Sequence, residues 1–217
     1  MAIPGEKCGP APRRLLVFGR VPEPGRVKTR LIPALGAAAA AALYQRLLYD
    51  TLTTAAGMTD VRVEFWCDAT DEEWPRGRKL AERFGVSGHR QLGADLGARM
   101  YHALGAELTT PPHPAVLIGS DCPGYDRAFL NQAFLVLADE DVVLGPALDG
   151  GYALIGVKWP AARLFSDIPW STGAVLRLTR ARLRALGWSW SELTPLRDID
   201  RPEDLASFPN LLQEPNS

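Results

Sequence analysis

The chain has 217 residues, of which 47% are apolar, and its formal net charge is −1. So small a net charge creates no overall field that would recruit nucleic acid or an anionic lipid surface, so any anion must be bound locally. The length suits one globular domain, which we expect over residues 13–212, with flexible tails at 1–12 and 213–217.

The cysteines and the N-terminal residues give information on the cellular compartment of the protein. Cys8, Cys67 and Cys122 are scattered and form no Cys-x-x-Cys pair, which argues against a disulfide framework and against a zinc knuckle. The N-terminal segment is too polar for a signal peptide, and no apolar run approaches membrane-spanning length. We therefore expect a cytoplasmic protein without a membrane span, and the sequence leaves open whether it forms a homo-oligomer.

Segments with helical and with strand periodicity alternate along the chain. In chain order, the pattern predicts a strand at 14–19, a helix at 36–56, a strand at 60–67, helices at 71–84 and 95–108, a strand at 115–119, a helix at 127–138, strands at 141–145 and 151–157, a helix at 173–186, a strand at 191–196 and a helix at 202–208. This alternation favours an α/β fold, a three-layer α/β/α sandwich with a mostly parallel sheet. Such sheets bind ligands at the carboxyl ends of their strands.

The loop after the first predicted strand is rich in proline, glycine and cations. Its single acid is Glu23, whereas its cations are Arg20, Arg26, Lys28 and Arg30. Between a strand and a helix, these features favour a phosphate cradle built from backbone N–H groups around Gly25 and from the cations. The glycine patterns of a P-loop and of a Rossmann fingerprint are both absent. A solvated basic turn is the alternative, and we expect no intrinsic partner to hold the cations.

Acidic residues that follow predicted strands are candidate metal ligands. Asp121 follows the strand at 115–119, and its carboxylate can hold Mg²⁺ or Mn²⁺ and, through the metal, a diphosphate. Asp198 and Asp200 lie two residues apart, so in an extended segment both carboxylates face the same side and can converge on one ion. The alternatives are a turn acid or helix cap at Asp121 and a helix cap at Asp200.

A Gly-Gly turn separates the strands predicted at 141–145 and 151–157. Gly150 and Gly151 allow the backbone to approach a ligand closely, and Asp149 can bind a hydroxyl or a metal-bound group. The alternative is a simple hairpin connection.

Two further segments precede predicted helices. Asp95 is expected to cap a helix, and a substrate or nucleobase contact from the same segment can coexist with that cap. Trp170 can form a stacking wall for a substrate, and Thr172 is either a helix cap or a substrate contact. The histidines lie near none of these segments and receive no role.

Six motifs occur in order between Leu15 and Phe208. They are Phe18-x-x-x-Pro22-x-Pro24-Gly25-x-Val27-Lys28-Thr29-Arg30-Leu31, Asp95-Leu96-Gly97-x-Arg99-Met100, Ile118-Gly119-Ser120-Asp121-Cys122-Pro123, Leu144-Gly145-Pro146-x-x-Asp149-Gly150-Gly151-Tyr152, Trp170-Ser171-Thr172 and Asp198-x-Asp200-x-Pro202-x-Asp204-Leu205. This pattern resembles the DUF2064 group, whose members are described as glycosyltransferase A-like or nucleotide-diphospho-sugar transferase-like. Relatives on that fold include molybdopterin and phospholactate guanylyltransferases as well as sugar transferases.

The resemblance implies a glycosyltransferase A-type fold and a metal-dependent transferase. Its donor would be a nucleotide or nucleotide-sugar, and its acceptor an unidentified small molecule. The cations Arg20, Lys28 and Arg30 would neutralise the phosphates, while Mg²⁺ or Mn²⁺ would be held by Asp121, Asp198 and Asp200. The remaining candidates are Asp95 for the nucleotide, and Gly150, Gly151, Trp170 and Thr172 for the substrate.

Two chemistries remain open under this resemblance. In nucleotidyl transfer, an acceptor phosphate attacks the α-phosphorus, and positioning with charge stabilisation suffices, for which Lys28 is the candidate. In glycosyl transfer, an acceptor hydroxyl attacks the anomeric carbon, and Asp149 is the candidate base. The alternative from another class is a catalytically silent nucleotide-binding regulatory protein, against which the intact acids Asp121, Asp198 and Asp200 argue.

Overall fold

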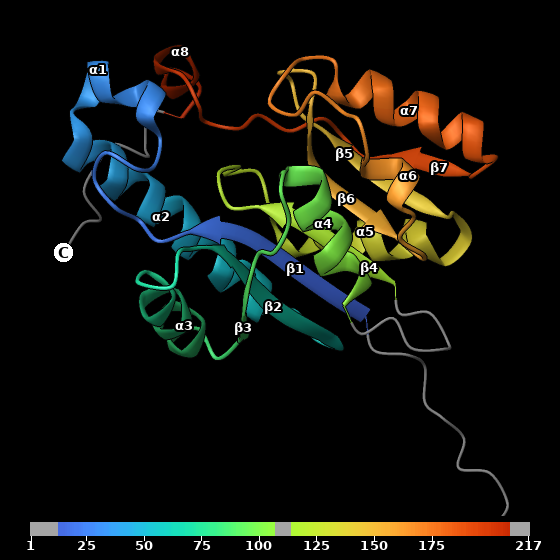
Figure 1. The fold of residues 1–217 in the computed structure, drawn as a ribbon, viewed down its shortest axis with the longest axis horizontal. Coiled ribbons are helices and arrows are strands. Elements are labelled where there is room, and N and C mark those ends of the chain that lie inside the picture. The colour runs from blue at the N-terminus through green and yellow to red at the C-terminus, as the bar shows by residue number, and fades with distance from the viewer. Residues whose placement is uncertain (1–12, 107–113, 209–217) are drawn as a thin grey trace, which may run out of the picture.

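The computed structural model describes residues 13–106 and 114–208, and a seven-stranded sheet with helices on both faces lies at its centre (Figure 1). In their order across the sheet, the strands are β3 (Ser87–Arg90), β2 (Val61–Asp68), β1 (Arg13–Arg20), β4 (Ala115–Gly119), β6 (Tyr152–Val157), β5 (Val142–Pro146) and β7 (Trp190–Glu192). Among these described strands, β6 alone runs antiparallel to its neighbours. The mostly parallel sheet predicted from the sequence is therefore confirmed.

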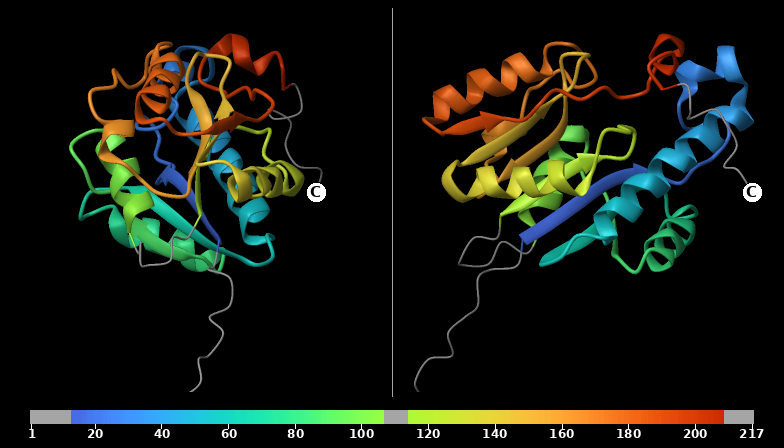
Figure 2. Two further views of the ribbon diagram at one scale, coloured as in Figure 1. Left: turned by 90° about the vertical axis from the view of Figure 1, so that its right-hand side faces the viewer. Right: turned by 180° about the vertical axis from the view of Figure 1, so that it is seen from behind.

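The helices that pack against the sheet form one layer on each of its faces. The first layer contains α2 (Ala37–Ala56), α3 (Trp74–Arg83) and α5 (Arg127–Asp139), and the second contains α4 (Leu96–Gly105), α6 (Ala162–Phe165) and α7 (Val175–Leu186). Each layer has its own apolar core against the sheet, and Figure 2 shows the two layers on either side of the strands. The three-layer α/β/α sandwich is confirmed.

Strand β1 shows why the sequence forms this sheet. Leu15 and Val17 pack into the core on one face, and Leu16 and Phe18 pack into the core on the other. A strand buried on both faces reads as a continuous apolar run, which is typical of a central parallel strand. The strand ends at Arg20, the first of the loop cations, which β1 places at the carboxyl edge of the sheet.

The C-terminal segment returns across the strand ends to the N-terminal helices (Figures 1 and 2). Its Ile199 is fully buried in a small apolar cluster with Leu31 and Leu47, which also contacts Leu205. The elements that meet there are η1 (Thr29–Leu31), α1 (Ile32–Leu35), α2 and α8 (Pro202–Leu205). The cluster brings the loop after β1 and the C-terminal acids to the same place.

Several element boundaries differ from the sequence prediction. Sequence patterns do not predict β3, because Ser-Gly-His-Arg at the sheet edge lacks apolar alternation, nor do they predict η1, α1 and α6, which are about one turn long. The strand predicted at 191–196 has the wrong bounds, because β7 covers Trp190–Glu192. After β7, Leu196 forms an isolated bridge with Ala147.

Helix α4 ends at Gly105, and residues 107–108 of the predicted helix lie outside the described residues, as do the predicted tails at 1–12 and 213–217. Within the described parts of the chain, no helix is both long enough and apolar enough to cross a bilayer.

Candidate functional site

A cleft of about 750 Å³ opens at the carboxyl ends of the parallel strands. The candidate residues that line it are Arg20, Lys28, Arg30, Asp95, Asp121, Asp149, Gly151, Trp170, Thr172, Asp198 and Asp200. Gly25 and Gly150 are not part of this lining. Residues from six separate motifs therefore meet in one place, as the rule for parallel sheets leads one to expect.

The pair formed by Lys28 and Asp121 joins the loop after β1 to the end of β4. Lys28 Nζ donates to Asp121 Oδ2 at 3.1 Å, and the Lys28 side chain is only 4% exposed, against 44% for Asp121. Buried Val27 and Leu31 anchor the loop on either side of the lysine. Lys28 itself takes a left-handed backbone conformation with φ of 47°, which is uncommon outside glycine and is frequent at functional sites.

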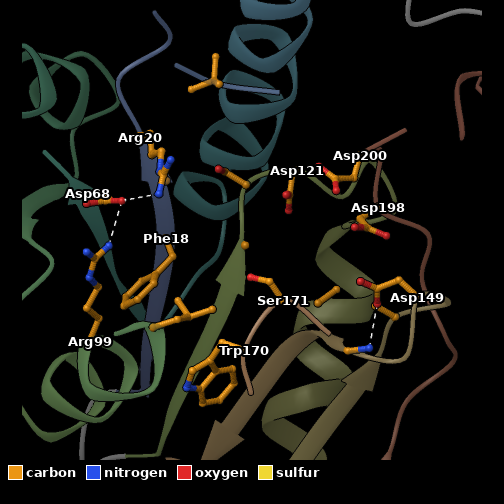
Figure 3. Close-up of a pocket in the computed structure, with 18 of the residues that line it drawn as sticks. Phe18, Arg20, Asp68, Arg99, Asp121, Asp149, Trp170, Ser171, Asp198 and Asp200 are labelled. Atoms are coloured by element: carbon orange, nitrogen blue, oxygen red, sulfur yellow. Dashed lines mark hydrogen bonds and ion pairs between the residues drawn. The ribbon is translucent and has the colours of Figure 1, made fainter. Parts of the chain in front are cut away.

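A second pair joins Arg30 to Asp200 in the C-terminal segment. Buried Ile199 lies between Asp198 and Asp200, so the acids flank a residue that points into the core. The Ile199 N–H donates to the carbonyl of Asp121 at 3.2 Å, which ties this segment to the end of β4. In Figure 3 all three acids lie next to one another in the cleft.

Burial and the charges of Asp121 and Asp149 raise the pKa of the Asp198 carboxyl from 3.8 to about 6. These neighbouring negative charges outweigh the opposing effect of Lys28. Lys28 therefore compensates the negative charge around Asp198 only in part, and carboxylate oxygens are the ligands that Mg²⁺ and Mn²⁺ prefer.

The donor chemistry of the acids therefore fits such an ion. In the described residues, however, no three His, Cys, Asp or Glu side chains stand arranged to hold a metal together. Magnesium usually takes one or two carboxylates and completes its shell with water and substrate phosphates, which this arrangement suits.

The Asp149 turn is held by its own hydrogen bonds. The Gly151 N–H donates to Asp149 Oδ1 at 2.8 Å, and the Leu176 N–H at the start of α7 donates to the Gly150 carbonyl at 2.9 Å. Gly150 has a φ of 90°, and a Cβ there would clash with the carbonyl of Gly173. This packing accounts for the glycine at 150, and the predicted hairpin connection between β5 and β6 is present.

Trp170 stands beside the N-terminal end of α4. Its indole packs on Gly97, where a Cβ would lie 2.7 Å from the Trp170 Nε1, and its ring meets that of Tyr152 edge to face at 6.4 Å. Asp95 caps α4 by accepting from the Ala98 N–H at 2.8 Å, which agrees with the expected cap. The substrate contact proposed for Trp170 stays a prediction.

Thr172 is engaged locally, because its Oγ1 donates to the Pro169 carbonyl at 2.7 Å and accepts from the Ala174 N–H at 3.4 Å. These bonds make Thr172 a turn-capping residue just ahead of α7. Its predicted substrate contact is untested.

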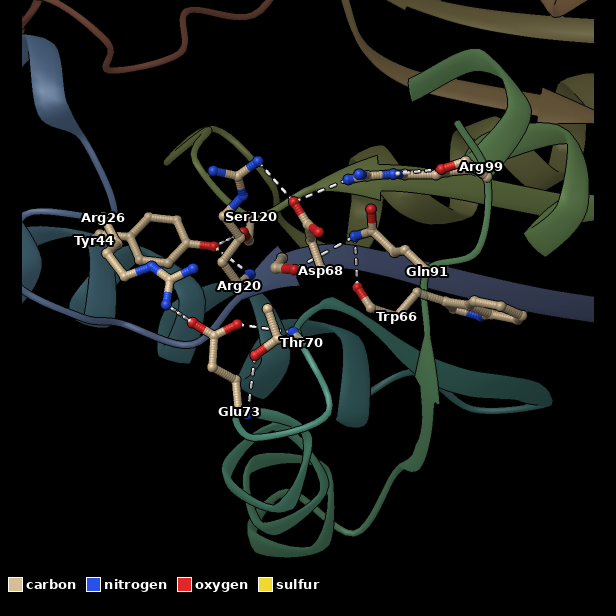
Figure 4. A network of polar contacts seen from close by, with 12 residues as sticks. Arg20, Arg26, Tyr44, Trp66, Asp68, Thr70, Glu73, Gln91, Arg99 and Ser120 are labelled. Carbon is tan, nitrogen blue, oxygen red and sulfur yellow. Dashed lines mark hydrogen bonds and ion pairs between the residues drawn. The ribbon is translucent and has the colours of Figure 1, made fainter. Parts of the chain in front are cut away.

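The expectation that the loop cations lack intrinsic partners is wrong. Each of the four has an acidic partner from another part of the chain. Arg20 pairs with Asp68 and Arg26 with Glu73 (Figure 4), Lys28 pairs with Asp121, and Arg30 pairs with Asp200. These partners are distant in sequence, so local composition could not reveal them.

Three further residues of the cleft have no predicted role. Asp68, Gln91 and Arg99 all line it. Asp68 is the last residue of β2, so the rule that singled out Asp121 at a strand end also applies to it. Arg99 lies one helical turn after the cap Asp95, on the same face of α4, a spacing that could have indicated it.

Comparison with solved structures identifies the fold as that of nucleotide-diphospho-sugar transferases and cytidylyltransferases. The chain is 30% identical to a putative nucleotide-diphospho-sugar transferase from Desulfovibrio desulfuricans, over 92% of this chain and 88% of that chain, with a TM-score of 0.84. A cytidylyltransferase from Leptospira borgpetersenii has 16% identity over 90% and 84% of the two chains, with a TM-score of 0.59. A CMP:2-keto-3-deoxy-manno-octonic acid synthetase solved with CTP has 11% identity over 92% and 98%, with a TM-score of 0.58.

The family model described as "Uncharacterized protein conserved in bacteria (DUF2064)" matches residues 51–172. The chain belongs to this family, and the expected membership is confirmed. Among curated proteins, none matches the chain. The matched range includes Asp95, Asp121, Asp149 and Trp170 but neither the loop after β1 nor the C-terminal acids.

Proposed function

We propose that this protein is a metal-dependent transferase that uses a nucleotide or nucleotide-sugar donor. The observation that supports this proposal is the pairing of loop cations with cleft acids, Lys28 with Asp121 and Arg30 with Asp200. A complex of a divalent metal with a nucleotide carries the complementary charges, because its metal suits carboxylates and its phosphates suit ammonium and guanidinium groups. Such a complex would replace each internal pair by a matched contact.

The residues then divide by charge. Lys28 and Arg30 bind donor phosphates, and buried Lys28 supplies a fixed positive charge close to the transferred group. Asp121, Asp198 and Asp200 are the residues that would hold Mg²⁺ or Mn²⁺. When bound, the metal would supply neutralisation of the charge that develops on the phosphate oxygens.

The transferred group is either a nucleotidyl or a glycosyl unit. For glycosyl transfer, Asp149 is the base. Its Oδ1 is engaged by the Gly151 N–H, whereas its Oδ2, which accepts no hydrogen bond from the described residues, can receive a proton from an acceptor hydroxyl. For nucleotidyl transfer, an anionic acceptor attacks the α-phosphorus and needs no such base. The relative solved with CTP makes a nucleoside triphosphate the first donor to test.

A thermal-shift panel of nucleotides and nucleotide-sugars, each with and without Mg²⁺ or Mn²⁺, tests the proposal. A donor raises the melting temperature more with metal than without it, because a ligand of the native state stabilises that state. Product assays then separate the chemistries, since nucleotidyl transfer releases pyrophosphate and glycosyl transfer from a nucleotide-sugar releases the free nucleotide. Binding without either product, across a broad acceptor screen, would instead identify a catalytically silent nucleotide-binding protein.

A further inference from the structure

Two arginines converge on one carboxylate oxygen in the cleft. Arg20 Nη2 lies 2.7 Å from Asp68 Oδ2, and Arg99 Nη1 lies 2.9 Å from the same atom. Arg20 ends β1, Asp68 ends β2, and Arg99 belongs to α4, so three elements assemble this cluster. We call these three residues the arginine cluster, and Figure 4 shows both guanidinium groups directed at Asp68.

The arginine cluster keeps a surplus of positive charge and of hydrogen-bond donors. One carboxylate neutralises only one of the two guanidinium groups. A guanidinium has five N–H donors, and the recorded bonds of Arg99 use Nη1 on Asp68 and Nε on the Gly93 carbonyl at 3.4 Å. The side chains of Arg20 and Arg99 are 57% and 28% exposed, so a ligand in the cleft can reach them.

Surrounding hydrogen bonds hold the cluster in place. The Arg20 N–H donates to Tyr44 Oη at 2.8 Å, and this hydroxyl is bonded to Ser120 Oγ at 2.9 Å. Next to Asp68, Gln91 Nε2 donates to the Trp66 carbonyl at 2.9 Å. These contacts fix the ends of β1 and β2 (Figure 4). A pre-positioned pair of arginines loses little conformational freedom when it binds an anion.

The arginine cluster lies apart from the acids that would hold the metal. Figure 3 shows Arg20, Asp68 and Arg99 on one side of the cleft, and Asp121, Asp198 and Asp200 on the other side. Lys28 and Arg30 already accompany those acids and suffice for donor phosphates there. With the donor phosphates assigned to Lys28 and Arg30, the arginine cluster is available for an anionic group of another molecule.

We propose that Arg20 and Arg99, held by Asp68, bind an anionic group of the acceptor, either a phosphate or a carboxylate. This inference rests on the proposed function, in which Lys28 and Arg30 take the phosphates of the donor. It defines the acceptor as a phosphorylated or carboxylated small molecule and makes Asp68 a positioning residue. It also separates Arg20 from the donor phosphates to which the sequence analysis assigned it.

The test uses inorganic phosphate and malonate as probes of the two anion types. Each is titrated calorimetrically into the full-length protein, once alone and once saturated with Mg²⁺ and the nucleotide that binds best in the panel. Loss of a charge-assisted bond predicts that R99Q weakens the probe that binds by about tenfold. Nucleotide affinity in R99Q should stay unchanged. R99K should keep part of the probe affinity, because lysine keeps the positive charge but lacks the planar guanidinium group that binds an anion through two N–H donors.

R78Q is the matched control, because within the described parts of the chain Arg78 pairs with its neighbour Glu82 on α3 and does not line the cleft. It removes the same charge and should change neither affinity. Circular dichroism melts of each variant show that the fold is retained.

Two results would overturn the inference. One is probe binding that R99Q leaves unchanged, or no saturable probe binding at all. The other is probe binding that competes with the nucleotide while R99Q weakens both, because the anion would then be a donor phosphate. Failure of the proposed function looks different: wild-type protein would show no metal-dependent nucleotide binding, and the probe titration of nucleotide-free protein would still report on the arginine cluster.

Discussion

Lys28 Nζ lies 3.1 Å from Asp121 Oδ2, so the proposed phosphate cation and a proposed metal ligand neutralise each other. A metal at Asp121 and a phosphate at Lys28 each require this pair to open. Whichever ligand binds first releases the group that the other needs. Linkage then makes the coupling reciprocal, so metal and nucleotide each strengthen the binding of the other.

The substitution K28M separates these two effects. Without the ammonium group, Asp121 is free and its negative charge is uncompensated, so Mn²⁺ alone should bind several-fold more tightly. The donor loses a charge-assisted contact, so nucleotide affinity in the presence of metal should fall about tenfold. Electron paramagnetic resonance measures free Mn²⁺, and calorimetry measures nucleotide binding.

K79M is the control for K28M, since Lys79 is exposed on α3 and outside the cleft lining. It should alter neither binding constant. Weaker Mn²⁺ binding by K28M would contradict the idea that Lys28 competes with the metal.

Asp198 predicts an unusual pH dependence of stability in the metal-free protein. Burial, Asp121 and Asp149 raise the pKa of its carboxyl to about 6 in the folded state. A carboxyl whose folded pKa exceeds its unfolded value binds its proton more tightly when folded, so its contribution to stability falls as pH rises through this range. Lowering the pH from about 7 to about 5 should therefore favour the folded state through this group.

The matching variant is D198N, which keeps the shape and removes the titration. Differential scanning calorimetry with a chelator should show a smaller gain in stability at low pH for D198N than for wild-type protein. Saturating Mg²⁺ should reverse the wild-type trend, because the metal needs the ionised carboxylate. If the stability of the two metal-free proteins depends on pH in the same way, Asp198 is not the source of the pH dependence.

Much of the site could be predicted because it obeys a local rule. The apolar runs of β4 and β5 end abruptly, and the polar residues Asp121 and Asp149 follow at the carboxyl edge of the sheet. Strand position alone therefore places these acids in the cleft. The alternation of residues in an extended segment likewise explains Asp198 and Asp200 on either side of buried Ile199.

The charge pairs could not be predicted because they depend on tertiary structure. Lys28 and Asp121 are 93 positions apart, and Arg30 and Asp200 are 170 apart. No periodicity relates residues at such separations. The left-handed backbone conformation of Lys28 could not be predicted either, because sequence patterns expect that conformation at glycine. Strand β3 could not be predicted for a different reason, because its pairing with β2, and not its own composition, makes it a strand.

Gly97 should be intolerant of a side chain, although it lies in a helix that alanine normally favours. A Cβ at this position would clash with the Phe165 carbonyl and approach the Trp170 Nε1 to 2.7 Å. We expect G97A to destabilise the protein by about 1–3 kcal/mol through overpacking and to displace Trp170 from the cleft wall. Chemical denaturation and tryptophan fluorescence measure the two effects.

Gly105 supplies the control in the same helix. A Cβ there meets nothing closer than the Pro160 Cγ at 3.9 Å, so G105A should be neutral or slightly stabilising. Equal stability of the two variants would show that Trp170 can move away from residue 97 at little cost in folding free energy.

The substitution D149N distinguishes the two proposed chemistries. If the protein transfers sugars, loss of the base should reduce turnover by about a hundredfold or more while the dissociation constant of the donor stays the same. If it transfers nucleotidyl groups, the acceptor is already anionic, and D149N should cost much less activity than D121N. The isosteric amide can still accept from the Gly151 N–H through its oxygen, so the turn is retained. Release of pyrophosphate and of free nucleotide is measured for both variants with the same donor. If the wild-type protein releases pyrophosphate and D149N loses most of this activity, the assignment of Asp149 as a base needed only for sugar transfer is contradicted.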